Sequence, residues 1–376
     1  MRFVHSSDWQ LGMTRHFLAG EAQARYTAAR IDAVGTIGAL AVEEGCSFVV
    51  VSGDVFESNH VERQVVVRAL DAMKAVPGVT FYLLAGNHDP LDAASVFRSV
   101  TFAENCPSNV VVIADSTPVE VAPGVEIVGA PWPNKRPLAD LVSKALGGLT
   151  ADGTLRIVVG HGGVTSMAPN PTDPALISVD AVGSALTSGT VHYVALGDRH
   201  STTQVDSAGR VWYSGTPEQT DYDEVDPGNV LLVELGRGSV SVERRKVGTW
   251  TFVRKHFDVG DREGIRQVER FLDGLTDKQR TIVKLSLVGQ LSLVDMAALT
   301  SELEHASELF GALEQWKRHS ELVVLPDDHD FEELGLSGYG RDALEELRSI
   351  GSGTGEEASV ARGALGLLFR LASVER

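Results

Sequence analysis

Short apolar runs alternate with amphipathic stretches along the first part of the chain. Runs such as Ser47–Ser52 predict strands covered on both faces, because they offer no polar side to solvent. Apolar positions at helical spacing in Glu21–Glu44 and Val61–Lys74 predict helices between these strands. The strand–helix–strand order predicts parallel pairing with right-handed crossovers. The first three predicted strands are Arg2–Ser7, Ser47–Ser52 and Val79–Ala85.

The pattern changes after the third predicted strand. Several of the next apolar runs lie too close together in sequence for a crossover helix to connect them. They predict a second sheet, mixed or antiparallel, packed on the first. These runs are Val110–Ala114, Val125–Ala130, Leu155–Gly160, Val191–Leu196, Arg210–Ser214, Val230–Leu235 and Ser239–Lys246.

A smaller domain is predicted to begin near Trp250, where strand-like and helical stretches alternate again. Their β-α-β-α-β order is typical of a compact α+β domain. The stretches are Thr251–Phe257, Gly264–Leu275, Thr281–Val288, Leu293–Phe310 and Glu321–Pro326.

Two helices are predicted at the C-terminal end, Arg341–Ser349 and Glu356–Val374. The second carries a one-sided apolar stripe, which suits packing on its own protein and docking on a partner equally well. The sequence therefore predicts three parts: residues 1–249, residues 250–326, and a linker with helices over residues 327–376.

Polar clusters directly follow five of the predicted strands. Loops at the carboxyl ends of parallel strands converge on one crevice, so we expect these side chains to meet. Their carboxylates, amide oxygens and imidazoles suit a pair of divalent metal ions, and paired metals suit phosphoester hydrolysis. The clusters contribute Asp8, Gln10, Asp54, Asn87, His88, Asp89, His161, Asp198 and His200.

Individual roles follow from the chemistry of these side chains. Asp54 is the candidate bridging ligand, because a carboxylate offers two oxygens. His88 adjoins Asn87 on one tight loop, so it is expected near the ions without necessarily binding one. It could protonate the leaving oxygen, with Asp89 orienting its ring. The other candidate ligands at this point are Asp8, Asn87, His161 and His200.

Composition narrows the function classes. The formal net charge of −18 argues against non-specific binding of nucleic acid, which needs clustered Lys and Arg. A nuclease stays open, because bound metal ions or a partner subunit can supply positive charge. No apolar run reaches the length of a membrane span. The apolar stretch at the N-terminus is too short for a signal peptide, because polar residues follow within a few positions. Cys46 and Cys106 are the two cysteines, and reduced thiols in a cytoplasmic protein are expected.

The set of clusters resembles the calcineurin-like metallophosphoesterase superfamily over about the first 250 residues. Within that superfamily it is most similar to the SbcD-type DNA repair exonucleases. The narrower resemblance is carried by Phe3–Gly12, Ser52–Phe56, Tyr213–Thr220 and Gly228–Glu234. The resemblance implies an α/β fold, a two-sheet α/β/β/α sandwich with a small α+β capping domain and C-terminal helices.

The resemblance also implies a function. One ion would be held by Asp8, Gln10, Asp54 and His200, and the other by Asp54, Asn87, His161 and Asp198. His88 would be the catalytic histidine. The family acts on DNA ends with manganese, together with an SMC-like ATPase of the SbcC type that binds C-terminal helices. Magnesium is the alternative metal, and a homodimer is left open.

Two positions depart from the family pattern. Gln10 and Asp198 stand where the pattern has histidines, so oxygen donors replace two imidazoles. Oxygen donors favour manganese or magnesium over zinc or iron. We expect Asp198 to strengthen its ion and Gln10 to weaken the other. Glu57 stands where many relatives carry a histidine near DNA.

These departures leave alternatives to an active two-ion nuclease. The centre could hold one ion and work slowly, or the protein could be a weakened nuclease kept as a scaffold. A small-substrate phosphodiesterase or phosphatase is the alternative of another class. It ranks lower, because the Gly53-Asp54 loop lacks the arginine that holds phosphate in protein phosphatases of the superfamily.

Overall fold

The computed structural model describes residues 1–324, 338–351, 353, 357–358, 360–361 and 364–365. The chain divides into two compact units, Met1–Trp250 and Thr251–Arg376. The first unit ends one residue beyond the predicted boundary. Trp250 belongs to it because its side chain is 1% exposed and its ring packs edge-on against Tyr26.

The first sheet has six strands in the order β12-β11-β1-β2-β3-β4. β1, β2 and β3 pair in parallel, which confirms the pairing predicted for the first three strands, and β4 pairs in parallel with β3. β11 is antiparallel to both β1 and β12. The strands are β1 (Arg2–Ser6), β2 (Phe48–Val51), β3 (Thr80–Leu84), β4 (Val110–Ile113), β11 (Asn229–Leu235) and β12 (Val240–Lys246).

The second sheet is mixed, as predicted, with six strands in the order β5-β6-β7-β8-β10-β9. Its four inner strands are parallel, and the strands at both edges are antiparallel to their neighbours. The strands are β5 (Val119–Ala122), β6 (Val125–Gly129), β7 (Leu155–His161), β8 (Tyr193–Gly197), β9 (Thr203–Gln204) and β10 (Val211–Tyr213).

Three strands were assigned to the wrong sheet by their spacing alone. Val110–Ala114, Val230–Leu235 and Ser239–Lys246 were expected in the second sheet, but they form β4, β11 and β12 of the first. β4 pairs in parallel with β3 after a helical crossover, whereas β11 and β12 form an antiparallel hairpin that joins the first sheet beside β1. Sequence spacing therefore cannot choose between the two sheets.

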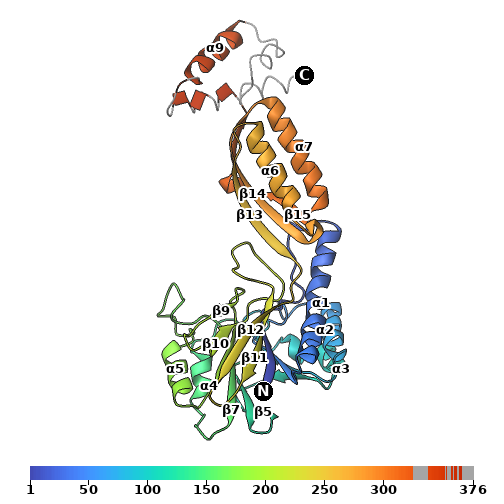
Figure 1. Ribbon diagram of the computed structural model, residues 1–376, viewed down its shortest axis with the longest axis vertical. Helices are drawn as coiled ribbons and strands as arrows, with labels where there is room; N and C mark the ends of the chain where they lie inside the picture. The colour runs from blue at the N-terminus through green and yellow to red at the C-terminus, as the bar shows by residue number, and fades with distance from the viewer. Residues whose placement is uncertain (325–337, 352, 354–356, 359, 362–363, 366–376) are drawn as a thin grey trace. The chain divides into compact units, whose positions relative to one another are not determined.

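Helices cover the outer face of each sheet, and the sheets pack face to face (Figure 1). An apolar layer between the sheets contains Phe3 and Phe48 of the first sheet and Tyr193 and Trp212 of the second. This α/β/β/α sandwich confirms the predicted fold class. The first sheet carries α1 (Glu21–Glu43), α2 (Arg63–Lys74) and α3 (Val100–Asn105), and the second α4 (Leu141–Leu146) and α5 (Val179–Thr187).

A buried histidine links the two sheets. His5 of β1 accepts a hydrogen bond at Nδ1 from the Tyr193 hydroxyl (3.1 Å) and donates from Nε2 to the Leu196 carbonyl (3.2 Å). Burial lowers the pKa of His5 to about 3. The ring is therefore neutral at physiological pH, with both nitrogens satisfied.

The second unit is built on a parallel sheet in which β14 pairs with β13, β15 and β16. Two helices share an apolar core with it. Its elements are β13 (Thr251–Asp258), α6 (Arg262–Gly274), β14 (Thr281–Leu291), α7 (Leu293–Leu309), β15 (Ala312–Gln315) and β16 (Glu321–Val324). The sequence pattern missed β15, which is four residues long.

The predicted C-terminal helix Arg341–Ser349 corresponds to α9 (Tyr339–Gly351). The second predicted helix, Glu356–Val374, lies for the most part outside the described residues. None of the described helices is long and apolar enough to span a membrane.

Candidate metal centre

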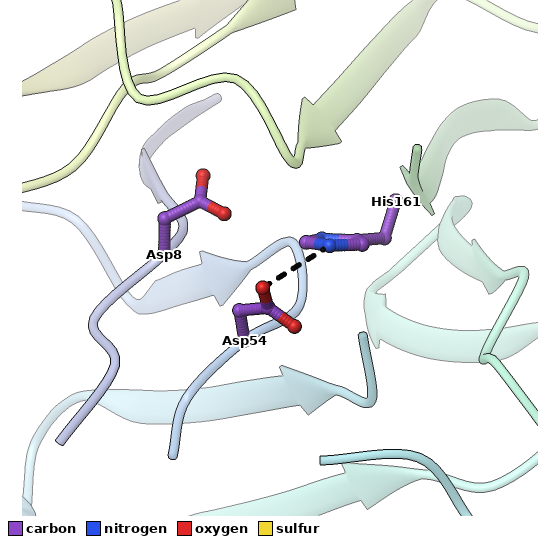
Figure 2. A group of neighbouring side chains, drawn as sticks. All are labelled: Asp8, Asp54 and His161. Atoms are coloured by element: carbon purple, nitrogen blue, oxygen red, sulfur yellow. Dashed lines mark ion pairs between the residues drawn. The ribbon is translucent and has the colours of Figure 1, made fainter. Parts of the chain in front are cut away.

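Carboxyl ends of strands from both sheets bring the predicted site residues together. Asp8 follows β1, Asp54 follows β2, and His161 ends β7. Each of these three side chains offers a ligand atom, and these atoms lie within 4.8 Å of one another. Figure 2 shows the three side chains approaching one another from separate segments of the chain, with an ion pair between Asp54 and His161. All three are buried, so the sandwich supplies a protected cluster of metal-ligand atoms.

The backbone holds several candidate ligands in an unusual conformation. Six non-glycine residues have positive φ among the described residues, and four belong to the predicted site: Asp8 (53°), Gln10 (41°), Asp54 (54°) and Asp198 (97°). Such conformations cost about 1–3 kcal/mol each and persist only where the surrounding structure imposes them. Main-chain bonds from Asp8 N to Gly53 O (3.0 Å) and from Gln10 N to Asp54 O (2.8 Å) join the first two loops.

Asp54 lies at the centre of the cluster. One carboxylate oxygen accepts a hydrogen bond from the His88 main-chain N–H (2.9 Å), and the other is 3.5 Å from His161 Nε2. Burial opposes the charge of Asp54, but His161 and His88 outweigh it and hold the pKa of this carboxyl below its ordinary value. A central carboxylate of this kind suits a bridging ligand.

His161 presents one ring nitrogen to several oxygen atoms. Its Nδ1 donates to the Ser52 carbonyl (2.8 Å), and its Nε2 lies 2.8 Å from Asn87 Oδ1 and 3.8 Å from Asp198 Oδ1. Burial disfavours the charged ring, but Asp54, Asp8 and Asp198 raise the pKa of His161 well above its usual value. A proton on Nε2 thus balances the carboxylates, and a divalent ion would take its place.

His200 is oriented by a carboxylate that the sequence analysis did not identify. His200 Nδ1 lies 2.9 Å from Glu224 Oε1 and 2.7 Å from Thr220 Oγ1. Burial opposes charge on this ring, but Glu224 and Asp8 raise the pKa of His200. A carboxylate bound to one imidazole nitrogen leaves the other for a metal ion. Glu224 ends a polar run typical of solvated loops, so no sequence signal marked it.

Asp8 and Asp198 are connected through the backbone. The Asp8 carboxylate accepts hydrogen bonds from the Ser7 hydroxyl (2.6 Å) and from the Asp198 N–H (3.0 Å). Burial raises the pKa of Asp8. The Asp198 side chain is 40% exposed, and one of its oxygens faces His161. The structure therefore places both aspartates at the cluster.

Gln10 contributes an unpartnered oxygen. The residue is 3% exposed, and its Oε1 is buried with no hydrogen-bond partner among the described residues. A buried acceptor left without a partner costs about 1–3 kcal/mol. A cation beside this oxygen would satisfy it. The orphaned oxygen and the surrounding carboxylates, amides and imidazoles fit divalent metal ions.

His88 lies beside the cluster, held by a different group from the one expected. Its Nδ1 donates to the Glu57 carbonyl (2.9 Å), and its Nε2 is 4.0 Å from Asp54 Oδ2. Asp89 was expected to orient this ring. Its carboxylate instead accepts hydrogen bonds from Gly86 N (2.8 Å) and Phe56 N (3.0 Å) among the described residues.

Asp89 therefore fastens two site loops together rather than contacting the His88 ring. Burial, reinforced by the charge of Asp54, raises the pKa of Asp89 to about 7. The loop after β2 places the Glu57 main-chain carbonyl beside the His88 ring, so this carbonyl accepts the hydrogen bond from His88 Nδ1. Asp89 thus acts on His88 only through the loop that carries both residues.

Two glycines allow the loops to approach this closely. A Cβ on Gly86 would lie 2.1 Å from Asp54 Oδ1, and one on Gly53 would lie 2.3 Å from His161 Nδ1. Gly53 also has a φ of +93°, which side chains rarely adopt. Larger residues at either position would push a candidate ligand out of place.

Comparison with known proteins places this site in a family context. The model of the calcineurin-like phosphoesterase family matches residues 1–202, more than half of the chain. No curated protein matches the chain.

Similar solved structures include TT1561 of Thermus thermophilus, with 10% identity over 65% of this chain and 98% of that one (TM-score 0.42). A dimetal phosphatase from Danio rerio has 14% identity over 64% and 98% (TM-score 0.37). A purple acid phosphatase, PPD1, from yellow lupin (Lupinus luteus) seeds has 12% identity over 65% and 51% (TM-score 0.38).

Proposed function

This chain belongs to the calcineurin-like phosphoesterase family, and from that premise we propose that it is a metal-dependent nuclease of the SbcD type that hydrolyses phosphodiester bonds in DNA. The observation that carries the proposal is the buried cluster of Asp8, Asp54 and His161, with His88 on the adjoining loop. Members of this family bind two divalent metal ions. We propose manganese, with magnesium as the alternative.

Different residues of the site would bind the metal ions and transfer the proton. Two bound divalent ions would neutralise the phosphate, orient it and activate a water molecule. Asp54, at the centre of the cluster, would contact both ions. His88 donates from Nδ1 to the Glu57 carbonyl, so Nε2 is the nitrogen that can exchange a proton. A protonated His88 would release that proton to the leaving oxygen.

A carboxylate near His88 favours a diester over a monoester. Glu57 Oε1 lies 3.9 Å from His88 Nδ1. A phosphomonoester is a dianion near neutral pH and is repelled more strongly by this charge than a diester, which carries one charge. Burial raises the pKa of Glu57, although the charges of His88, Arg30 and Arg15 oppose this rise. Arg15 donates to the Thr220 carbonyl and Arg30 to the carbonyls of Trp9 and Glu218, so main-chain carbonyls hold both guanidinium groups.

The stretch Tyr213–Thr220, which carries part of the SbcD-type resemblance, contributes to the site. Thr216 Oγ1 donates to the Asp8 carbonyl (3.0 Å), and Thr220 Oγ1 is 2.7 Å from His200 Nδ1. These two contacts hold the candidate ligands Asp8 and His200 in position. The resemblance of this stretch to the SbcD-type exonucleases is the reason for proposing DNA as the substrate rather than any phosphodiester.

The direct test uses the purified full-length chain. With manganese it should digest linear double-stranded DNA, alone or with its ATPase partner. His88→Asn should lower the rate by about 10²–10⁴-fold, the usual contribution of a general acid. Bound metal and the far-ultraviolet circular dichroism spectrum should stay unchanged. Absence of digestion by a protein that holds both ions, with and without the partner, would reject the nuclease proposal.

A small-substrate phosphodiesterase is the second candidate. It is favoured by the fact that every predicted site residue lies within Met1–Trp250, so the site does not need the second unit. Bis-p-nitrophenyl phosphate, cyclic nucleotides, p-nitrophenyl phosphate and DNA should be compared at equal metal loading. Higher kcat/KM for a cyclic nucleotide than for DNA would favour this candidate. Preference for the monoester would contradict both diesterase proposals.

We further propose that the C-terminal residues dock on an SMC-like ATPase of the SbcC type. The apolar stripe predicted over Glu356–Val374 supports this proposal. Deleting residues 351–376 should abolish co-elution with the ATPase and leave metal content unchanged. Undiminished binding of the deleted chain would contradict it. Tight binding without any turnover by the metal-loaded protein would instead support a scaffold role.

A further inference from the structure

The candidate ligands divide into two groups around Asp54. The first group is defined by distances from His161 Nε2, which lies 2.8 Å from Asn87 Oδ1, 3.5 Å from Asp54 Oδ2 and 3.8 Å from Asp198 Oδ1. This group therefore contains one imidazole, one amide oxygen and one carboxylate beside the shared Asp54.

The second group lies on the Asp8 side. Thr216 connects Asp8 with His200, because its N–H donates to the His200 carbonyl (3.0 Å) and its hydroxyl donates to the Asp8 carbonyl (3.0 Å). Gln10 follows two residues after Asp8, and its N–H bonds to the Asp54 carbonyl (2.8 Å). Its buried Oε1 has no partner among the described residues, so it is available to a cation. This group again contains one imidazole, one amide oxygen and one carboxylate.

We propose that these groups are chemically matched subsites for two ions of the same kind, and that the Gln10 amide oxygen is a metal ligand that shifts the centre's preference from zinc towards manganese. The inference rests on the metal-dependent part of the proposed function and is independent of the substrate.

Donor chemistry explains the preference. Each subsite offers three oxygens and one nitrogen, counting the shared Asp54. Oxygen donors suit manganese and magnesium, whereas additional nitrogen donors favour zinc and iron. Zinc binds most sites more tightly than manganese, so the relevant quantity is the ratio of the two affinities. Gln10 lowers the zinc-to-manganese affinity ratio on the Asp8 side, and Asn87 lowers it on the His161 side.

The subsites differ in burial rather than in ligand type. Asp8 is fully buried, whereas the Asp198 side chain is 40% exposed. Burial can change how tightly each ion is held, but it does not change which element the donors prefer. Both subsites should therefore select the same ion, and substitution at Gln10 should affect one of them only.

The chain offers a mirrored pair of variants for the test. Gln10→His and Asn87→His each replace one amide oxygen with a ring nitrogen, on opposite sides of Asp54. Zinc and manganese affinities should be measured by calorimetry on metal-free full-length protein. Each variant should raise the zinc-to-manganese affinity ratio of one subsite by about tenfold or more and leave the other subsite unchanged.

A third variant removes the donor without adding another. Gln10→Leu should reduce bound manganese from two ions per chain to one, as counted by elemental analysis after desalting. Its electron paramagnetic resonance spectrum should change from that of a spin-coupled pair to that of isolated manganese. Gln10→Glu keeps an oxygen donor and should retain both ions, which controls for disruption of the loop.

Two results would overturn the inference. One is retention of two manganese ions with wild-type affinity by Gln10→Leu. The other is an unchanged zinc-to-manganese ratio in Gln10→His when Asn87→His raises it. A wild-type protein that binds two manganese ions but leaves DNA intact would reject the nuclease proposal while supporting the matched subsites. The two failures are therefore distinguishable.

Discussion

Single residues around the metal centre act mainly by fixing which atom of a neighbour faces the cluster. Glu224 is the clearest example, because its carboxylate binds His200 Nδ1 and leaves Nε2 for an ion. Ser52 has the same effect on His161 through a main-chain carbonyl. An orienting side chain can be changed without removing a ligand, so its contribution can be measured separately from metal binding itself.

Glu224→Gln should weaken manganese binding on the His200 side by about 10–100-fold, the usual effect of losing a group that orients a metal ligand. The amide keeps the size of the side chain but loses the charge that supports the imidazole. Manganese titration of the metal-free protein measures the change. Asp221→Asn, on the exposed part of the same loop, is the matched control and should bind as the wild type does. Equal affinities in all three proteins would contradict this role.

The sequence predicted the residues whose position follows from topology. Asp8 and Asp54 follow parallel strands, and His161 ends one, so their convergence follows from the rule that carboxyl ends of parallel strands face one crevice. Glu224 could not be found in the same way, because its contact with His200 depends on the path of a loop. Asp89 was predicted at the site, but its hydrogen bonds to two backbone N–H groups depend on loop geometry that spacing does not encode.

Among the elements, β1 connects the site to the core between the sheets. It ends just before Asp8, and its His5 is buried and neutral, with a pKa of about 3 against 6.5 for an exposed histidine. Between these values the unfolded chain binds a proton that the folded chain does not. The free energy of unfolding should therefore fall as pH drops below 6.5.

This loss amounts to about 1.4 kcal/mol per pH unit, or about 2 kcal/mol at pH 5. Urea unfolding of metal-free wild type and His5→Gln at pH 7, 6 and 5 tests it. Glutamine can hydrogen-bond at the same place but does not titrate. The difference in unfolding free energy between the two proteins should therefore change with pH by this amount. Parallel pH profiles would show that His5 is not responsible.

The loop after β3 requires glycine at Gly86 because the Asp54 carboxylate lies close to it, and not because of a positive φ angle. Gly86→Ala would place a methyl group 2.1 Å from Asp54 Oδ1. We expect destabilisation by about 1–3 kcal/mol, typical of overpacking, and impaired manganese binding. Thermal unfolding and metal titration measure both effects. Gly78→Ala, before β3, meets nothing within 4 Å and is the control. A wild-type metal affinity in Gly86→Ala would show that the loop can relax.

For the molecule as a whole, the chain divides into two compact units after Trp250, and the contacts of the neighbouring residues explain the position of this division. Among the residues that the structure describes, three apolar cores lie within Met1–Trp250 and a fourth lies within the second unit. The end of the first unit is anchored, because the Glu218 carboxylate accepts hydrogen bonds from the N–H groups of Thr249 and Trp250 (2.9 and 3.0 Å). A piece that ends after Trp250 keeps these contacts, whereas one that ends before it exposes the core beside Tyr26.

Residues 1–250 expressed alone should therefore fold, bind two manganese ions and hydrolyse bis-p-nitrophenyl phosphate at a rate close to that of the full chain. Digestion of linear DNA should fall by more than this small-substrate activity. The piece has 18 basic and 28 acidic side chains, a formal net charge of −10, so a long polyanion needs further contacts to be held, and the piece lacks any that the second unit supplies. Comparing both rates in the piece and the full chain, at equal metal content, separates the two effects. Equal retention of both activities would assign DNA recognition to the first unit, and loss of both with the fold intact would show that the site is not confined to it.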